Sequence, residues 1–255
     1  MMAAREAARA WRQGRLGFSF DVAMPDQPAW PDQPELLHPA KMPRRGSGSA
    51  HGRIALWHAL AHIEFVAIDL ALDMAGRFGA QMCREFTSDF LSVAADEAMH
   101  FALLDRKLRT LGSHYGALPA HGGLWEAAAE TAHDVMARLA IVPMVLEARG
   151  LDVTPATLNK LRSSDHPDGA DENGVKILQR ILDDEIRHVG IGTKHFVAQC
   201  ERSGEIPQKR WKSLVAEHFR GAIKPPFNDS ARLAAGLSRD FYSTVAPLTV
   251  SRITP

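Results

Sequence analysis

The stretch DFLSVAADEAMHFALLDRKL, residues 89–108, indicates the fold class, because its apolar residues recur with the spacing of one helix face. Glu97 and His100 fall on that same face. An isolated buried carboxylate is costly or takes up a proton, so an acid and an imidazole on a face meant for the core need a partner there. The stretch therefore predicts an amphipathic helix that carries chemistry on its buried side.

The composition is that of an ordinary globular protein. The chain has 255 residues, of which 45% are hydrophobic and 24% charged, enough for one large domain with a buried core. Thirty basic residues balance thirty acidic ones, which argues weakly against a nucleic-acid substrate and favours neither a membrane surface nor a polyanion. Cys83 and Cys200 are too few for a disulfide framework or a thiolate zinc site.

The sequence carries no signal for a membrane or for secretion. We find no apolar run with the length of a membrane span. The Arg-rich stretch 1–17 lacks the apolar region of a signal peptide. We therefore expect a cytoplasmic protein without a membrane partner.

Residues 1–50 are expected to form an N-terminal arm and hinge. Six prolines between residues 25 and 43 exclude a helix there and favour an extended, polyproline-like path. Trp30 is a candidate for pinning this arm to the rest of the protein. Residues 44–49, with the sequence RRGSGS, are expected to act as the hinge.

Helical periodicity then continues to about residue 200, and breakers divide it into four long helices. Their expected ranges are about 51–78, 81–111, 124–149 and 174–201, with Gly79, Gly112 and Gly150 closing the first three. A short helix is expected to start at Thr154, which can cap it while Pro155 takes its first turn. No stretch alternates persuasively like a strand. We predict an all-α four-helix bundle over 51–202, with satellite helices packed on it over 203–255.

Each of the four helices places one glutamate in its apolar stripe, and two of them add a histidine three residues later. The candidate metal ligands are Glu64, Glu97, His100, Glu147, Glu185 and His188. Four buried carboxylates repel one another, so positive charge must lie among them, and two divalent cations would offset it. The order Glu, Glu-x-x-His, Glu, Glu-x-x-His is the ligand set of ferritin-like di-iron and di-manganese bundles. Oxygen and nitrogen ligands without a thiolate suit iron or manganese, with zinc as the alternative.

Two further Glu-x-x-His pairs are interpreted as surface pairs. They are Glu35 with His38 and Glu130 with His133. The first lies in the Pro-rich arm. The second lies about 25 Å before Glu147 along a helix axis, too far to join the same site.

His58 and His62 lie four residues apart, a spacing that suits a second metal site. Glu64 is two residues beyond His62 and points in another direction. Surface or hydrogen-bonded histidines are therefore the preferred interpretation.

Three charged residues are expected to support the ligands: Asp96, Asp184 and Arg187. Each aspartate could accept the free imidazole N–H of the histidine on the facing helix, which would fix its tautomer. Arg187, three residues after Asp184, could hold that carboxylate in turn. An exposed charge is the alternative for all three.

Pro143 is expected to kink the third helix one turn before Glu147, because it removes the hydrogen bond to the carbonyl of Leu139. Such a kink would either open the metal site to a substrate or dioxygen, or be a tolerated bend.

Four stretches resemble the ferritin-like superfamily, and within it a bacterial group catalogued as a domain of unknown function. They are ALAHIEFVAIDLALDMAGRF (59–78), TSDFLSVAADEAMHFALLDRKLRTLGSHYG (87–116), VPMVLEARGLDV (142–153) and DDEIRHVGIGTKHF (183–196). This resemblance covers about residues 16–200. It implies a ferritin-like four-helix bundle and a di-metal site, but no particular reaction.

Wider resemblances concern the chemistry. DEIRH, residues 184–188, resembles the pattern of bacterial multicomponent monooxygenases and acyl-carrier desaturases. EAR, residues 147–149, is similar to a segment of a di-iron tRNA nucleoside hydroxylase. Leu104 stands where the ribonucleotide reductase small subunit carries its radical tyrosine, which argues against that role.

These resemblances imply an oxidoreductase that activates dioxygen or peroxide to oxidise or hydroxylate a small molecule or a nucleoside, with tRNA as one source. A reductase or other electron donor, and an oligomer, are the further partners implied. The alternatives are a ferroxidase or iron-handling protein, and a non-enzymatic bundle that the metal stabilises.

Overall fold

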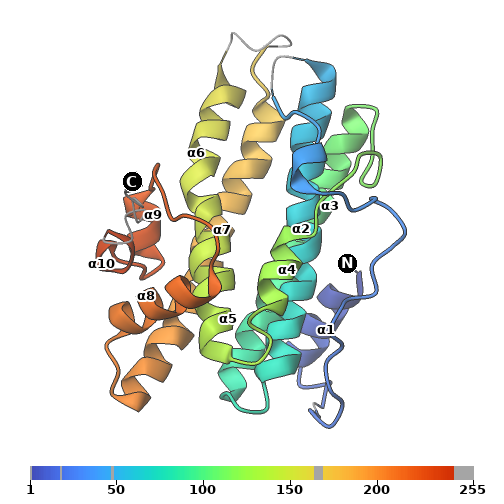
Figure 1. Ribbon diagram of the computed structural model, residues 1–255. Coiled ribbons are helices and arrows are strands. Elements are labelled where there is room, and N and C mark those ends of the chain that lie inside the picture. Colours follow the sequence, from blue (N-terminus) through green and yellow to red (C-terminus); the bar gives the residue numbers. More distant parts are fainter. Residues whose placement is uncertain (1, 18, 47–48, 164–168, 244–255) are drawn as a thin grey trace, which may run out of the picture. The chain divides into compact units, whose positions relative to one another are not determined.

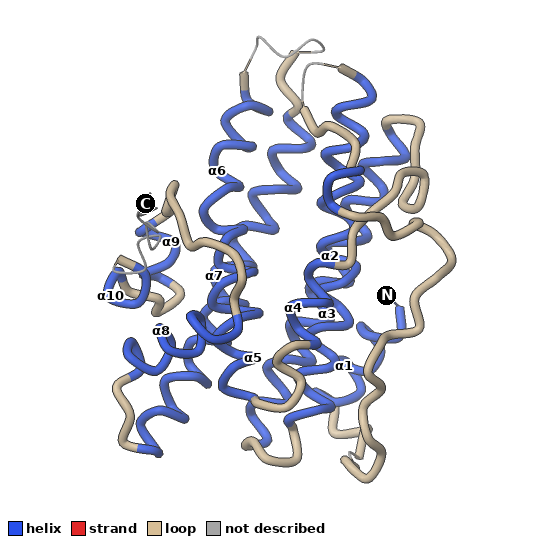
Figure 2. The backbone as a smooth tube through the Cα atoms, viewed as in Figure 1, coloured by secondary structure: helices blue, strands red, loops and turns tan. Residues whose placement is uncertain are grey.

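The protein is all-α, as predicted. The computed structural model describes residues 2–17, 19–46, 49–163 and 169–243. Over these residues the regular elements are helices, and the β pairing is limited to an isolated bridge between Leu36 and Ala120. Figure 2 shows these helices in blue, joined by tan loops.

The chain folds as two compact units, which we describe one at a time. The first unit comprises Met1–His133 and Thr154–Asp184, and the second comprises Asp134–Val153 and Glu185–Pro255. Helices α6 (Ala148–Arg162) and α7 (Glu172–Ser203) each contribute residues to both units. Helix α7 agrees closely with the range predicted as 174–201.

Helices α2 (Ala50–Phe78) and α3 (Arg84–Thr110) form the core of the first unit, side by side and antiparallel (Figure 1). Ser49 begins α2, because its Oγ accepts a hydrogen bond from the backbone N–H of Gly52 at 3.0 Å. At Gly79 the chain turns back, and a Cβ there would lie 2.5 Å from the ring of Phe20. The predicted ranges 51–78 and 81–111 are confirmed within three residues.

Helix α1 (Met2–Arg12) is not predicted by the sequence analysis. It packs against α3, where Trp11 Nε1 donates to Ser88 Oγ at 2.7 Å. The guanidinium of Arg84 lies 5.0 Å from the centroid of the Trp11 ring, which is cation–π geometry. The region predicted as an arm therefore begins with a docked helix.

Beyond α1 the Pro-rich arm lies along the first unit with one short 3-10 turn, η1 (Pro39–Lys41). Trp30 Nε1 donates to Asp69 Oδ2 at 3.2 Å, which confirms that Trp30 pins the arm. Trp125 Nε1 donates to the carbonyl of Asp26 at 3.2 Å, and the two indoles meet edge to face at 6.1 Å. Residues 47–48 of the predicted hinge lie outside the described residues.

The single helix predicted over 124–149 is wrong. The structure has α4 (Gly123–Ala129), a break, α5 (Val135–Ile141), a π-helical segment η2 (Val142–Glu147) and then α6. The break has a local cause, because Asp134 starts α5 with a side-chain cap, its Oδ1 accepting from the N–H of Met136 at 2.8 Å.

The separate helix predicted from Thr154 is also wrong, since α6 runs through Gly150 and Pro155 to Arg162. Pro155 has no N–H for the carbonyl of Leu151, which would normally end or bend a helix. In the second unit the side-chain amide of Asn228 donates to that Leu151 carbonyl at 3.1 Å. A residue distant in sequence therefore supplies the missing hydrogen bond.

The disturbance predicted at Pro143 takes the form of the π-helical segment η2 within the second unit. Gly192 of α7 makes room for it, because a Cβ at Gly192 would lie 2.3 Å from Cβ of Pro143. Single π-helical turns occur often at functional sites. Here η2 ends at Glu147, one of the candidate ligands.

Over the described residues after α7 the chain forms short helices, as predicted for the region after 203: α8 (Pro207–His218), α9 (Asp229–Ala234) and α10 (Arg239–Tyr242). Trp211 of α8 and Phe241 of α10 pack edge to face at 5.9 Å. Arg232 of α9 donates from Nε and Nη2 to the carboxylate of Asp152 in α6, at 2.8 and 2.7 Å. Residues 244–255 lie outside the described residues.

Helix α2 is long and apolar enough to cross a membrane, judged by length and composition alone. The expectation that no run has that length therefore fails for Ala50–Phe78. However, 61% of its most apolar window is buried inside the structure, as in a core helix of a soluble protein. One such helix is weak evidence for a membrane.

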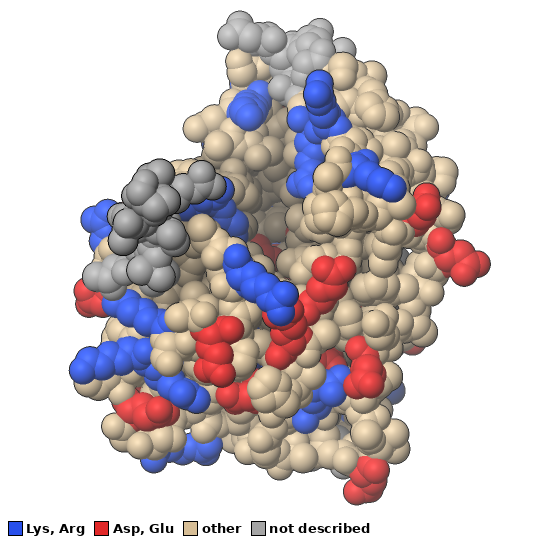
Figure 3. All heavy atoms as spheres, in the orientation of Figure 1, with Lys and Arg blue, Asp and Glu red and all other residues tan. Residues whose placement is uncertain are grey.

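Both signs of charge occur at the surface. Figure 3 shows lysine and arginine together with aspartate and glutamate on the face in view. This agrees with the formal net charge of +0.

Candidate metal centre

Glu64 of α2 and the pair Glu97 and His100 of α3 converge in the first unit. His100 Nδ1 lies 3.2 Å from Oε2 of Glu64 and 3.2 Å from Oε2 of Glu97. Each residue offers one potential ligand atom within 4.8 Å of the others. Helical spacing puts Glu97 and His100 on one face of α3, and the packing of α2 brings Glu64 opposite them.

This cluster is closed to solvent, with exposed fractions of 6% for Glu64, 1% for Glu97 and 0% for His100. Burial and then the charge of Glu97 raise the pKa of Glu64 well above its usual value. Burial alone would lower the pKa of His100, but hydrogen bonds to Glu64 and Glu97 outweigh it and raise that pKa to about 11. Without a metal ion, the imidazolium of His100 is thus the positive charge between the two acids.

Asp184, in the first-unit part of α7, holds the other nitrogen of the same imidazole. Its Oδ2 accepts from His100 Nε2 at 3.1 Å and from Arg180 Nε at 2.7 Å. Burial would raise the pKa of Asp184, but the hydrogen bonds from Arg180 and His100 lower it below its usual value. The pairing of Asp184 with the histidine of a facing helix is the one that the sequence predicts. Its role beside a metal stays a prediction.

Sequence reasoning missed Arg180. This residue lies one helical turn before Asp184 and donates to its carboxylate at 2.7 Å. The contact expected from Arg187 stays a prediction. The helical spacing did point to Arg180, because residues four positions before and three positions after Asp184 both lie on its face of the helix. Asp184 and then Asp96 raise the pKa of Arg180, so Asp96 lies near this ion pair.

The second unit repeats the Glu-x-x-His contact on α7. His188 Nδ1 lies 3.3 Å from Oε1 of Glu185, and Nη2 of Arg187 lies 3.4 Å from His188 Nε2. His188 is buried, while Glu185 is half-buried. Glu147, the last residue of η2, is half-buried in the same unit. That all six candidate ligands share one site stays a prediction.

The other two Glu-x-x-His pairs have different surroundings. His38 caps η1, its Nδ1 accepting from the N–H of Ala40 at 3.3 Å. Glu130 is exposed at the end of α4. Neither pair belongs to the buried cluster of the first unit.

His58 and His62 are buried and hydrogen-bonded, as the preferred interpretation had it. His62 Nδ1 lies 3.0 Å from the hydroxyl of Tyr115, and its Nε2 donates to the carbonyl of His121 at 3.2 Å. His58 Nε2 accepts from the N–H of Gly116 at 3.0 Å. Both imidazole rings therefore form hydrogen bonds with the connection that follows α3.

The donor set of the first unit fits a divalent metal. Two carboxylates and one imidazole nitrogen meet in a closed space, and the remaining imidazole nitrogen is held by an acid, the usual support for a metal-bound histidine. Oxygen and nitrogen ligands of this kind suit iron, manganese or zinc. A cation bound there would replace the positive charge of the imidazolium and release its proton.

The comparisons with known proteins name no activity. The chain is 42% identical over 217 residues to an "Uncharacterized protein" of Haemophilus influenzae (strain ATCC 51907 / DSM 11121 / KW20 / Rd), an alignment that covers 83% of this chain and 74% of the relative. No solved structure matches the chain. A family model described as "Protein of unknown function (DUF455)" matches residues 1–243. The match spans nearly the whole chain, and the protein therefore belongs to this family.

Proposed function

We propose that the protein is a ferritin-like di-metal carboxylate oxidoreductase that uses dioxygen or peroxide to oxidise or hydroxylate a small molecule or a nucleoside. The observation that carries this proposal is the environment of His100. Its Nδ1 faces Glu64 and Glu97, and its Nε2 is held by Asp184, all in a closed interior. Such an arrangement costs stability in a purely structural core and is the ordinary environment of a metal ligand.

The proposed ligands are the six that the sequence pattern selects. Glu64, Glu97 and His100 come from the first unit, and Glu147, Glu185 and His188 from the second. The ligands of the second unit are supported by a repeated contact. The Nδ1 of His188 faces the carboxylate of Glu185 three residues before it, as the Nδ1 of His100 faces that of Glu97. Iron is the metal we expect, with manganese or zinc as alternatives.

The bound metals would supply the redox chemistry, and the chain would supply position and polarity. Asp184 holds the Nε2 proton of His100, which leaves the Nδ1 lone pair for a metal. Arg180 keeps Asp184 ionised and in place. The buried position of Glu97 and His100 excludes bulk water from their side of the cluster. A separate reductase would deliver electrons.

The first experiment is metal analysis of protein purified without added metal, followed by loading with ferrous iron and exposure to dioxygen. We expect two metal ions per chain and oxidation of a single centre. Accumulation of ferric mineral would instead indicate a ferroxidase or iron-handling protein. Metal bound without any reaction would indicate a bundle that the metal only stabilises.

A matched pair of variants tests the assignment of the ligands. Glu97→Gln removes a buried carboxylate from the cluster, while Glu85→Gln changes an exposed one on the same helix α3. We expect Glu97→Gln to lose stoichiometric metal and Glu85→Gln to keep it. Equal metal content in the two variants would overturn the assignment.

A further inference from the structure

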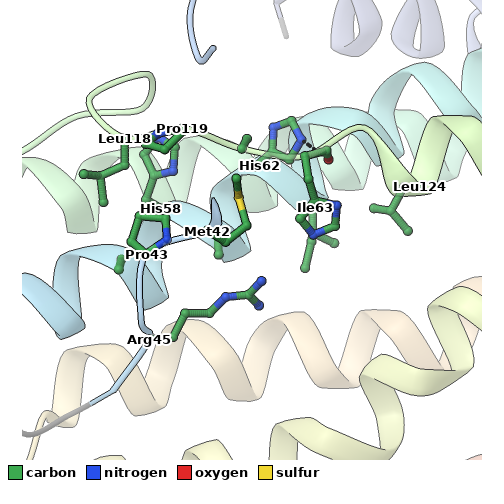
Figure 4. Close-up of a pocket in the computed structure, with 13 residues that line it drawn as sticks. Met42, Pro43, Arg45, His58, His62, Ile63, Leu118, Pro119 and Leu124 are labelled. Carbon is green, nitrogen blue, oxygen red and sulfur yellow. Dashed lines mark hydrogen bonds between the residues drawn. The ribbon is translucent and has the colours of Figure 1, made fainter. Parts of the chain in front are cut away.

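A pocket separate from the cluster of Glu64, Glu97 and His100 lies in the first unit between the arm, α2 and the connection that follows α3 (Figure 4). Its volume is about 140 Å³. Met42 of the arm, Ile63 of α2, and Leu118 and Leu124 from the connection and α4 give it apolar walls. It lies across α2 from the metal cluster, because His62, which lines it, is half a helical turn away from Glu64.

Hydrogen bonds hold the wall formed by the connection against α2. Gly116 donates its N–H to His58 Nε2 at 3.0 Å, from a backbone φ of +97° that favours glycine. Tyr115 donates its N–H to Asp105 Oδ1 at 3.1 Å, and its ring stacks on His58 at 5.4 Å. The arm joins the same connection, because Leu37 donates to the carbonyl of Ala120 at 2.8 Å. The pocket is therefore built in advance of any ligand.

Two histidines of the pocket, His58 and His121, each keep one ring N–H as a donor. His58 is 2% exposed, and because its Nε2 accepts from Gly116, its Nδ1 carries the hydrogen. Burial, followed by the charges of His62 and His114, lowers the pKa of His58 to about 4, so the ring is neutral at neutral pH. His121 accepts from the N–H of Gly123 through Nδ1 at 3.3 Å, which leaves Nε2–H as a donor.

Arg45 of the arm brings a full positive charge to the same pocket. Burial and then the nearby charge of Arg45 lower the pKa of His121, and the charge of Glu126 opposes them, so Arg45 and Glu126 are both neighbours of His121. The residues that line the pocket include no aspartate or glutamate. A ligand for this site should consequently be an acceptor with negative charge.

The size of the pocket limits the apolar part of the ligand to about one ring, since a dry cavity of about 150 Å³ can bind benzene. We propose that this pocket binds a small aromatic carboxylate, with its ring against Met42, Ile63 and Leu124 and its carboxylate at Arg45 and His121. This site is distinct from the metal centre and does not depend on the proposed oxidation chemistry.

Benzoate is the probe, with uncharged benzamide of nearly the same shape as its control. Each is titrated into the full chain by calorimetry, and saturation-transfer NMR reports contact with the ring. We expect benzoate to bind at least about tenfold more tightly than benzamide, because a charge-assisted hydrogen bond to a guanidinium contributes that much. Similar affinities for the two probes, or no binding of benzoate, would overturn the proposal.

Two arginine variants test whether the charge of Arg45 holds the carboxylate of benzoate. Arg45→Gln should weaken benzoate binding about tenfold or more, while Arg44→Gln, at an exposed neighbour that does not line the pocket, should leave it unchanged. Equal losses in both variants would mean that benzoate responds to general surface charge, which would refute the site.

Ala59→Leu tests the location of the ring, because Ala59 lines the pocket and a larger side chain would fill it. We expect this variant to abolish binding of both probes while its circular dichroism stays that of the parent. Unchanged benzoate binding would place the ligand elsewhere. If Ala59→Leu does not fold, the two arginine variants alone decide the question.

Discussion

His100 Nε2 and Asp184 Oδ2 lie 3.1 Å apart in the first unit, which joins α3 to the start of α7 through a buried imidazole. Arg180 donates to the same Oδ2 at 2.7 Å, so the carboxylate is shared between a histidine and an arginine. The acid thereby fixes the tautomer and the orientation of the ring whose other nitrogen faces Glu64 and Glu97. Changes at Asp184 should therefore affect the metal chemistry before they affect the fold.

Asp184→Asn should preserve the fold and most of the metal, but slow the oxidation of the reduced, iron-loaded protein by dioxygen about 10- to 100-fold. The amide keeps the shape of the side chain while losing the charge that makes the imidazole a stronger donor. The control is Asp183→Asn, which changes the exposed neighbour on the same helix. An unaltered oxidation rate in Asp184→Asn with full metal would show that the charge of Asp184 does not tune the metal centre, although its carboxylate contacts His100.

Arg180→Leu should slow the same oxidation in the same direction, because Asp184 loses the cation that holds it. The double variant with Asp184→Asn should be less than additive if the two residues act through one network. Stopped-flow absorbance of the oxidised centre gives the rates of all four proteins. Additive losses would mean that Arg180 and Asp184 act independently.

The stability of chelator-treated protein should fall as the pH rises from about 7 to about 9. His100 has a pKa of about 11 in the folded protein, above its ordinary value of 6.5, so its contribution is fully present below about 6.5 and is lost as the pH approaches 11. The raised pKa of Glu64 acts in the same direction. We expect a loss of about 2 to 3 kcal/mol over this interval, measured by urea unfolding, because the folded state holds one more proton than the unfolded state throughout it.

Metal loading should reverse this dependence, because binding releases the proton of His100 and a higher pH favours that release. His100→Gln should flatten the dependence of the chelator-treated protein on pH. A stability that rises with pH in the absence of metal would contradict the protonation state assigned to His100.

The helices that could be predicted from the sequence are those whose signals are local. Helix α2 has an apolar stripe, with a capping serine directly before it and a closing glycine directly after it, and it ends where predicted. Helix α1 was missed although its Ala- and Arg-rich sequence favours a helix locally. Only its docking is tertiary, since Trp11 donates to Ser88 of α3. The passage of α6 through Pro155 was missed because Asn228, distant in sequence, supplies the bond that proline cannot.

The convergence of Glu64, Glu97 and His100 could be predicted because helical spacing alone puts each residue in an apolar stripe. The partner of Asp184 could not be chosen in this way. Positions 180 and 187 are both suitably spaced, and only the structure shows the 2.7 Å contact from Arg180. The pocket lined by Arg45 could not be predicted either, because its wall from 118–124 is distant in sequence from the residues of the arm and of α2 that it meets.

Asp152→Ala should lower the free energy of unfolding by about 3 to 5 kcal/mol, because it leaves the buried guanidinium of Arg232 without its acid. The double variant Asp152→Leu with Arg232→Met should recover most of this loss, since it removes both charges. As a control, Glu205→Ala removes an acid from the more exposed pair with Arg210 and should cost at most about 1 kcal/mol. Urea unfolding measures all of these; a small loss in Asp152→Ala would show that water reaches Arg232.

Gly192→Ala and Gly150→Ala should have opposite effects on stability, although both glycines lie inside helices. Alanine normally favours a helix by about 1 kcal/mol over glycine, and a Cβ at Gly150 would meet nothing within 4 Å, so Gly150→Ala should stabilise the protein by up to that amount. A Cβ at Gly192 would lie 2.3 Å from Cβ of Pro143, so Gly192→Ala must displace η2 and should cost about 1 to 3 kcal/mol.

Because η2 ends at Glu147, Gly192→Ala should also reduce metal content if Glu147 is a ligand. Urea unfolding and metal analysis of both variants test this, and stabilisation by Gly192→Ala would show that η2 does not depend on close packing against α7.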